Sequence, residues 1–446
     1  MSNISGNSTS GLLYPQVGDE VKMVRTNTSI RIESKVAEGG QGVVFRGVDK
    51  NGHDLAIKWY KKNKYLERQY RLIENLTSHS RPHKAFAWPI DIVLHSNVIG
   101  FGYAMVWVEA RFISLVEMLK ERLQPDFRTL ISIGTELVEA FSTLHSRGLC
   151  YKDINFGNLL VDPYTGEVAI VDNDNVASEV TKQGIKGTLR FMAPELITNS
   201  AAPSTTTDLH SLSVFLFYLF MHGHPLEGQR VNVSYTWEPG QNISETTLAT
   251  HFFGEEPIFV YDPWDVSNRP DYDSPIIRWW DIYPTFFKNV FIKAFTQGLK
   301  NPSLMTRVNE TEWRSALYKL NDQLSVCSCG AAIFVDFEQS NKKCWNCGNV
   351  PVLLFTISTP SGISALSEGF KLTKHHLYRD FKYRDAIGVT ERHPSQHDQL
   401  VLKNTSNMTW AIEPIGEERK EVKPGQRMLV RPMNMSIGSA RIEIYR

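Results

Sequence analysis

The feature that most constrains the fold of this chain is a loop that carries a carboxylate and an amide five residues apart. Asp153 and Asn158 stand in this loop, after a segment (130–144) whose apolar residues repeat at helical spacing. The apolar run 168–171 then predicts a strand that places a second carboxylate, Asp172, at its end. Carboxylate and amide oxygens can hold Mg²⁺ on nucleotide phosphates, and a nearby carboxylate can orient an incoming hydroxyl and take its proton. The spacing therefore predicts phosphoryl transfer, with Asp153 as the catalytic carboxylate and Asn158 and Asp172 as magnesium ligands.

A glycine-rich segment, residues 37–44, lies between two β-type runs upstream of this loop. Gly39 and Gly42 lack side chains where a backbone would have to approach triphosphate oxygens, although a plain hairpin turn has the same pattern. Lys58 follows at strand spacing in Ala56-Ile57-Lys58, where its ammonium can hold the α- and β-phosphates. The two features together predict an ATP site.

In order and spacing, these segments resemble the eukaryotic-type (Hanks-type) protein kinase family, including its bacterial serine/threonine kinases. The resemblance extends to the end of the expected helical lobe through Gly187-Thr188, Ala193-Pro194-Glu195, Asp208 and Arg307. It implies a bilobal α+β kinase fold over residues 28–322, with an N-lobe to about residue 110 and a helical C-lobe after it.

The resemblance also implies roles for individual residues. ATP would be covered by Gly39, Gly40, Gly42 and Val44, its adenine would contact Ala56, and its phosphates would contact Lys58. An acidic residue on the N-lobe helix would pair with Lys58. Glu67 is expected there rather than Glu74, because Glu74 leaves too little helix before the turn at 79–82.

Several positions depart from the commonest family pattern: Tyr151 replaces His, Lys152 replaces Arg, Asn155 replaces Lys, and Asn173-Asp174 replaces Phe-Gly. Because the residues that the chemistry requires are all present, the sequence predicts an ATP- and Mg²⁺-dependent serine/threonine kinase with protein substrates. An ATP-binding pseudokinase scaffold and an adaptor that acts through the C-terminal region are the alternatives.

A narrower resemblance links the chain to bacterial kinases encoded near von Willebrand type A proteins and PP2C-type phosphatases. It rests on the polar pair after Asp172, on Asp262-Pro263 and on the segment 267–270. It implies that proteins of these two classes are partners.

Four of the five cysteines form two close pairs, Cys327/Cys329 and Cys344/Cys347. Four thiolates with turn-forming glycines beside them suit tetrahedral Zn²⁺ in a closed, structural site. Iron in the same cage and four unligated thiols are the alternatives. The pattern predicts a zinc knuckle over residues 323–351.

The C-terminal residues 352–446 contain short β-type runs separated by turns, which predicts an all-β accessory domain. This region resembles a forkhead-associated β-sandwich in Ala386-Ile387-Gly388, 400–404 and 424–426. Val389 stands where such domains carry the arginine that grips phosphothreonine.

Charge and hydropathy complete the expectations. Lys plus Arg and Asp plus Glu both number 48, so the net charge favours neither a nucleic-acid nor a membrane partner. The longest apolar run, 214–221, is too short to span a bilayer, and the N-terminus has no secretory pattern. We expect a cytoplasmic protein with a flexible N-terminal segment (1–27) and a Trp-rich insertion (228–283) in the C-lobe.

Overall fold

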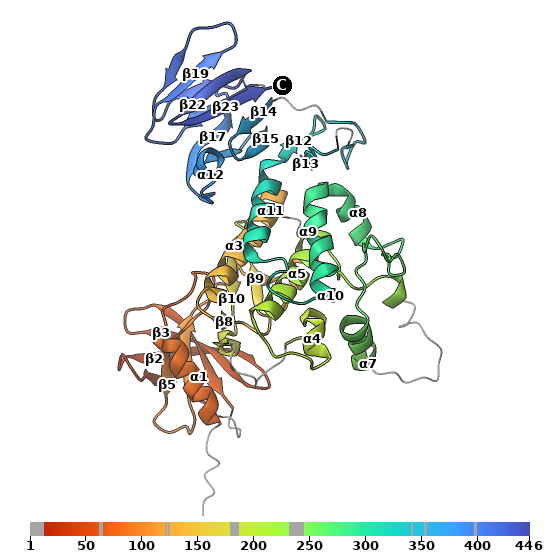
Figure 1. Cartoon of the computed structure of the whole chain (residues 1–446). Coiled ribbons are helices and arrows are strands. Elements are labelled where there is room, and N and C mark those ends of the chain that lie inside the picture. The colour runs from red at the N-terminus through yellow and green to blue at the C-terminus, as the bar shows by residue number, and fades with distance from the viewer. Residues whose placement is uncertain are drawn as a thin grey trace, which may run out of the picture.

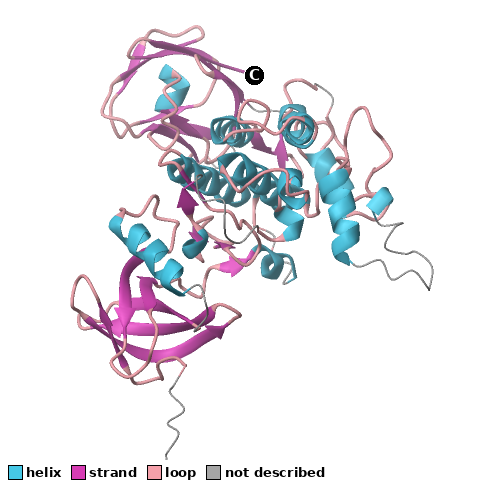
Figure 2. Ribbon diagram, turned by 60° about the horizontal axis from the view of Figure 1, so that its bottom comes forward, coloured by secondary structure: helices cyan, strands magenta, loops and turns pink. Residues whose placement is uncertain are grey.

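The computed structural model describes residues 13–61, 66–120, 123, 125–178, 187–231, 245–339, 342–351, 355–396 and 399–446. A strand-rich N-terminal part is followed by a helical body and then by a second strand-rich part (Figure 1). The two strand-rich parts lie at opposite ends of the helical body, as Figure 2 also shows. In the described part of the chain, no helix combines the length and apolar character needed to cross a membrane.

The N-terminal part is a closed barrel with the strand order β1-β2-β3-β4-β6-β5. Its interior is filled by alternating apolar side chains, among them Ile30, Phe45 and Ile57, which are at most 1% exposed. Helix α1 connects β4 to β5 and packs Ile73 and Leu76 into the adjoining core. The elements are β1 (Glu20–Met23), β2 (Ser29–Glu38), β3 (Gly42–Asp49), β4 (Asp54–Tyr60), α1 (Leu66–Ser78), β5 (Pro89–Leu94) and β6 (Gly102–Val106).

Strand β1 corrects the expectation that residues 1–27 form a flexible segment. Residues 1–12 lie outside the described residues, but β1 pairs with both β2 and β5 and so closes the barrel. Val21 and Met23 alternate into the core, where they are 0% and 7% exposed. A four-residue strand leaves only two apolar positions, which is too weak a pattern to detect in a polar N-terminal segment.

The helical body is built around α5 (Thr205–Met221), which is buried along nearly its whole length and is apolar on all sides over residues 214–221. Helix α3 (Phe127–His145) begins at Asp126, whose side chain accepts a hydrogen bond from the Thr129 amide. Helices α9 (Thr285–Phe295) and α11 (Glu310–Asp322) pack beside them. Shorter helices complete the body: α2 (Leu115–Lys120), α4 (Pro194–Ile197) and α10 (Gln297–Lys300).

The predicted insertion is anchored by aromatic and amide contacts, although residues 232–244 lie outside the described residues. The rings of Tyr261 and Trp280 stack with centroids 4.2 Å apart. The buried Asn268 amide donates to the carbonyls of Leu226 and Ile258. Its elements are α7 (Glu245–Ala249), a π-helical turn at 250–255 and α8 (Pro275–Ile282).

After α11, the hairpin β12 (Leu324–Val326) and β13 (Ala332–Phe334) leads into a sandwich of two antiparallel sheets. One sheet has the order β15-β14-β23-β22-β19-β20, and the other has the order β16-β17-β18-β21. The sandwich has its own apolar core, with Trp410 fully buried in it. The strands are β14 (Phe355–Thr359), β15 (Gly362–Leu366), β16 (Lys371–Thr373), β17 (Ala386–Arg392), β18 (Leu400–Asn404), β19 (Trp410–Pro414), β20 (Lys420–Val422), β21 (Arg427–Leu429), β22 (Met433–Ile437) and β23 (Ala440–Tyr445), with helix α12 (Lys374–Tyr378) after β16.

Candidate active site

Strand β4 carries the predicted phosphate-binding lysine into the space between the barrel and the helical body. Lys58 is paired with Val44 on β3 and with Tyr103 on β6, and it is 6% exposed. Ala56 lies two residues earlier on the same face of β4 and is 5% exposed. The barrel therefore brings Val44, Ala56 and Lys58 together on neighbouring strands.

The glycine-rich segment forms the turn between β2 and β3, where the Gly39 amide donates to the Gly42 carbonyl. A Cβ added at Gly42 would lie 2.4 Å from the backbone oxygen of Trp59, so the close approach of β4 requires glycine there. A Cβ at Gly39 or Gly40 would meet no described atom within 4 Å. These two glycines leave the tip of the turn open, whereas Gly42 serves strand packing.

The predicted catalytic loop is held by its own amides. The Asn158 side chain donates to the Asp153 carbonyl at 2.9 Å and to the Asp153 carboxylate at 3.2 Å. The Asn155 side-chain oxygen accepts from the Gly157 and Asn158 amides. The Thr188 hydroxyl donates to the other oxygen of the Asp153 carboxylate at 3.0 Å. Asp153 is partly exposed, so its carboxylate is accessible in the cleft.

Asp208 fixes the base of the same loop from inside the helical body. Its carboxylate accepts from the amides of Tyr151 and Lys152 and contacts Nε2 of His145 at 3.0 Å. Tyr151, which is fully buried, donates its hydroxyl to the Val171 carbonyl. Tyr151 and Lys152, which differ from the commonest family pattern, thus lie in a loop that is hydrogen-bonded both to α5 and to the segment before Asp172.

Strand β10 (Val168–Ile170) delivers Asp172 beside the catalytic loop, and the Val171 amide donates to the Asn158 carbonyl at 2.9 Å. Asp172 has a left-handed backbone with φ of 57°. Its carboxylate accepts a hydrogen bond from Lys58 Nζ, which links the barrel to the helical body. Burial and then the nearby Asp174 charge raise the pKa of Asp172 above its ordinary value.

Glu67 does not take the place expected for it. Its side chain is 82% exposed and pairs with Arg71 at 2.6 Å along the solvent face of α1. Among the described residues, the structure brings Lys58 to Asp172 and Asp174 instead. The reason is the helix phase, because α1 turns Ile73 and Leu76 inward.

The four predicted zinc ligands converge in the loops after β12 and β13. Sγ of Cys327 lies 3.7 Å from Sγ of Cys347, and Sγ of Cys329 lies 3.8 Å from Sγ of Cys344. All four sulfurs lie within 4.8 Å of one another. A tetrahedron with zinc–sulfur bonds of about 2.3 Å has edges of about 3.8 Å, so the four thiols fit a tetrahedral ion.

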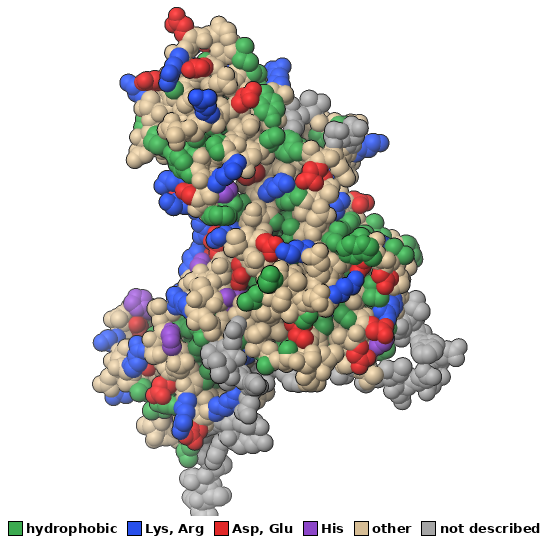
Figure 3. Space-filling model, in the orientation of Figure 1, with side chains coloured by type: hydrophobic (Ala, Val, Ile, Leu, Met, Phe, Trp, Pro, Cys, Tyr) green, Lys and Arg blue, Asp and Glu red, His purple; other side chains and the backbone are tan. Residues whose placement is uncertain are grey.

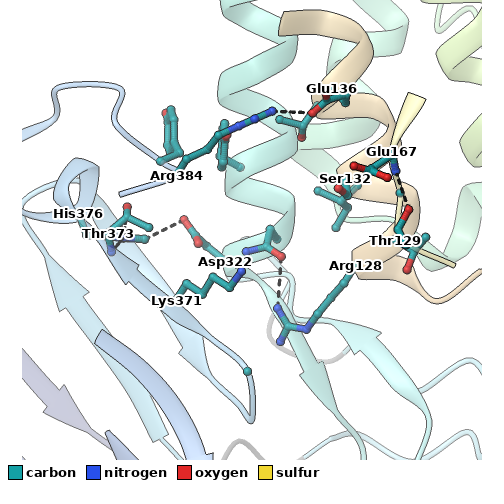
Figure 4. Close-up of a pocket in the computed structure, with 18 of the residues that line it drawn as sticks. Arg128, Thr129, Ser132, Glu136, Glu167, Asp322, Lys371, Thr373, His376 and Arg384 are labelled. Carbon is teal, nitrogen blue, oxygen red and sulfur yellow. Dashed lines mark hydrogen bonds and ion pairs between the residues drawn. The ribbon is translucent and has the colours of Figure 1, made fainter. Parts of the chain in front are cut away.

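A separate cleft of about 520 Å³ lies away from the catalytic loop, between α3, α11 and the sandwich (Figure 4). Arg384 reaches from the sandwich to Glu136 on α3 at 2.7 Å, and His376 contacts Asp322 on α11 at 3.1 Å. Arg128 of α3 donates to the Glu368 carbonyl at 3.0 Å. Polar contacts therefore hold the sandwich against the helical body.

Comparison with known proteins identifies the family. A family model described as the protein kinase domain matches residues 30–256, just over half of the 446 residues. The chain is similar to the serine/threonine-protein kinase PITSLRE of Drosophila melanogaster, with 28% identity over 226 residues that cover 48% of this chain and 23% of the relative. It is also similar to the serine/threonine-protein kinase PknA of Mycobacterium tuberculosis, with 27% identity over 233 residues that cover 48% of this chain and 51% of the relative.

A third relative is calmodulin-binding receptor-like cytoplasmic kinase 2 of Arabidopsis thaliana, with 25% identity over 240 residues that cover 48% of this chain and 56% of the relative. The chain thus spans about a quarter to just over half of the length of these relatives. The matches confirm the predicted resemblance to serine/threonine protein kinases and fit the bilobal α+β arrangement of barrel and helical body. The chain belongs to the protein kinase domain family.

Proposed function

We propose that this chain is a protein kinase that transfers the γ-phosphate of ATP to serine and threonine hydroxyls of protein substrates. The proposal rests on one observation, the convergence of Lys58, Asp153, Asn158 and Asp172 between the barrel and the helical body. Phosphoryl transfer is catalysed mainly by positioning and by electrostatic stabilisation, which these groups can supply.

The roles follow from the chemistry of each group. Asn158 and Asp172 would hold Mg²⁺, which neutralises phosphate charge when it is bound. Lys58 holds the phosphates, and Asp153 orients the acceptor hydroxyl and accepts its proton. The nucleotide is covered by the barrel residues Gly39, Gly40, Val44 and Ala56, whereas Gly42 serves strand packing.

The surroundings of Asp153 support its proposed role toward an acceptor hydroxyl. Thr188 donates a hydrogen bond to one carboxylate oxygen, and the Asn158 amide contacts the other. Asn155, at the position where a lysine is expected, braces the loop through three hydrogen bonds. Two of the relatives, PITSLRE and PknA, are serine/threonine-protein kinases by name, which supports a serine or threonine acceptor.

The test is Mg²⁺-dependent transfer of labelled γ-phosphate from ATP to an added protein acceptor such as casein. The proposal predicts transfer that needs both Mg²⁺ and the acceptor. Nucleotide binding without any transfer would instead support the pseudokinase scaffold. The departures Tyr151, Lys152, Asn155 and Asn173-Asp174 motivate that alternative.

We further propose that the Cys327, Cys329, Cys344 and Cys347 cluster holds one structural Zn²⁺ at the junction between the kinase region and the sandwich. The tetrahedral fit of the sulfurs supports zinc, and with four protein ligands the ion would keep no open position for catalysis. The kinase domain would then include strand β1 and extend to residue 322, followed by the zinc knuckle (323–351) and the accessory domain (352–446). Reduced thiols favour a cytoplasmic location.

The C-terminal sandwich pairs a six-stranded sheet with a four-stranded sheet. This architecture supports the proposal of a forkhead-associated-like accessory domain. An adaptor role through this domain is the second candidate. Partnership with a von Willebrand type A protein and a PP2C-type phosphatase is supported only by the sequence resemblance. Co-purification of the full chain with either partner would test it.

A further inference from the structure

Asp174 is a buried carboxylate to which the proposed mechanism has given no task. Its side chain is 5% exposed, and its two oxygens lie 3.0 and 2.9 Å from Lys58 Nζ. The Tyr60 hydroxyl donates a further hydrogen bond to the same carboxylate. A buried carboxylate is costly unless it is paired and hydrogen-bonded, and Asp174 satisfies both conditions.

The local backbone explains how Asp174 reaches the barrel. The left-handed conformation of Asp172 is followed by a 3₁₀ turn, η1 (Asn173–Asn175), which turns the chain back. The Asn173 amide anchors this turn by donating to the Ile170 carbonyl at 3.0 Å. On β4, Lys58 and Tyr60 are two residues apart and so point to the same face. The turn therefore places the carboxylates of Asp172 and Asp174 opposite Lys58 and Tyr60 of the strand.

The carboxylates of Asp172 and Asp174 differ in their hydrogen bonds and in their burial. Asp174 accepts hydrogen bonds from both Lys58 and Tyr60, and its side chain is 5% exposed. Asp172 also accepts from Lys58, but its side chain is 32% exposed. Lys58 and Tyr60 thus compensate the buried Asp174, and the more exposed Asp172 is left for a divalent cation.

Helix α1 offers no substitute among its described side chains. Glu67 is 82% exposed and paired with Arg71, and Glu74 is also exposed. Both acidic residues therefore lie on the solvent side of the helix, away from Lys58.

We propose that Asp174 is the positioning partner of Lys58 and takes the role expected for an acidic residue on α1. The inference rests on the proposed kinase function. Asp172, the proposed magnesium ligand, and Asp174, the partner of Lys58, then lie in one turn of the chain. Lys58 and Asp172 are therefore positioned together, without a contribution from an α1 carboxylate.

The test compares Asp174→Asn with Glu67→Gln, since both remove one carboxylate charge. We expect kcat/KM for Mg·ATP to fall about 10²-fold in Asp174→Asn, the cost of a misplaced catalytic group, and to change less than about twofold in Glu67→Gln, as for an exposed surface pair. Tyr60→Phe removes only the hydroxyl that donates to Asp174, so a loss of about threefold to tenfold is expected. A reversed ranking, with Glu67→Gln the damaging change, overturns the inference.

A double-mutant cycle separates positioning from general stability. Affinity for a non-hydrolysable ATP analogue with Mg²⁺ is measured in Asp174→Asn, Lys58→Met and the double variant. We expect Asp174→Asn to weaken the affinity of the parent but to have no further effect in Lys58→Met. An equal effect in both backgrounds means that Asp174 acts only on structure and overturns the inference.

This binding cycle does not need phosphoryl transfer. If the parent transfers no phosphate, the proposed function fails, while the affinities still decide whether Asp174 acts through Lys58. If Asp174→Asn does not fold, Tyr60→Phe in the two Lys58 backgrounds decides the same point.

Discussion

The catalytic cleft and the contact between the helical body and the sandwich are both built from charged residues, but they differ in burial. In the cleft, the side chains of Lys58 and Asp174 are 8% and 5% exposed. At the sandwich contact, Glu136 is 8% exposed but its partner Arg384 is 52% exposed, whereas His376 and its partner Asp322 are 2% and 16% exposed. Breaking a buried pair leaves an uncompensated charge, whereas a half-exposed pair is largely replaced by water. We therefore expect the buried Lys58–Asp174 pair to matter for the chemistry and the Glu136–Arg384 pair to contribute mainly to domain orientation.

Charged side chains are also spread over the wider surface of the protein. On the face shown in Figure 3, basic and acidic side chains are interspersed over the helical body and the sandwich. The rings of Tyr318 on α11 and Tyr383 in the sandwich stack with centroids 3.5 Å apart, so the contact also has an aromatic component. The half-exposed ion pairs of Arg384 should contribute less free energy than the buried Lys58–Asp174 pair.

The largest expected effect is that of Asp153→Asn. We expect phosphoryl transfer to fall on the order of 10²–10⁴-fold, since general-base groups contribute that much. Affinity for Mg·ATP should stay within about threefold, because the carboxylate acts on the acceptor hydroxyl rather than on the nucleotide. Initial rates and nucleotide titrations on the same preparations measure both. Unchanged turnover would remove Asp153 from the mechanism.

A strong effect on stability is expected for Cys344→Ser. Metal binding supplies folding free energy to small sites, so loss of one ligand should release zinc and lower the stability of the junction by several kcal/mol. Cys150→Ser is the matched change outside the cluster and should leave one zinc per chain. Elemental analysis and thermal unfolding check this. A parent without metal, or a Cys344→Ser variant that melts like the parent, contradicts the zinc proposal.

A smaller effect is expected from pH through His145, which supports the base of the catalytic loop. Burial alone would lower the pKa of His145, but the carboxylates of Asp208 and Glu310 raise it to about 9. Because an unfolded histidine has a pKa of about 6.5, this stabilisation is complete below that pH and is lost as pH rises through 9, up to ~3 kcal/mol.

Denaturant unfolding between pH 6 and pH 10 measures this loss. In His145→Gln, the part of the pH dependence of the unfolding free energy that comes from His145 should disappear. A parent whose stability is constant between pH 6.5 and pH 9 would show that His145 is not charged in the folded protein.

The smallest effect is expected for Arg384→Ala at the sandwich contact. Its ion pairs with Glu136 and Glu139 are half exposed, so we expect a loss of at most about 1 kcal/mol and kinase turnover close to that of the parent. Lys374→Ala, which removes an exposed pair within the sandwich, is the control. A loss of turnover in Arg384→Ala, but not in Lys374→Ala, would overturn the view that this contact only orients the domains.

The sequence could predict the parts of the cleft whose positions depend on motif order. Asp153 and Asn158 lie in one loop, and strand β10 carries Asp172 beside them, so their proximity follows from spacing. The four cysteines converge for a similar reason, because each close pair lies in one tight loop. The succession of β-rich N-lobe, helical lobe and β-rich C-terminal region also follows from hydrophobic periodicity.

The remainder depended mainly on a backbone turn, which periodicity does not encode. The 3₁₀ turn after Asp172 directs Asp174 to Lys58, and the only sequence signal was an acidic residue in place of glycine. The exposure of Glu67 could have been predicted, because Ile73 and Leu76 define the inward face of α1. Gly42 was expected to make room for ATP, but the Trp59 carbonyl occupies the space beside it.

The central claim is serine/threonine phosphorylation by this cleft, and phosphosite mapping by mass spectrometry tests it most directly. The parent and Asp153→Asn are incubated with Mg·ATP and casein at equal nucleotide occupancy, and the modified residues are identified. We predict phosphoserine and phosphothreonine on casein in the parent and a loss of at least about 100-fold in Asp153→Asn. Phosphotyrosine as the main product, equal modification by both proteins, or a nucleotide-bound parent that modifies nothing would contradict the account.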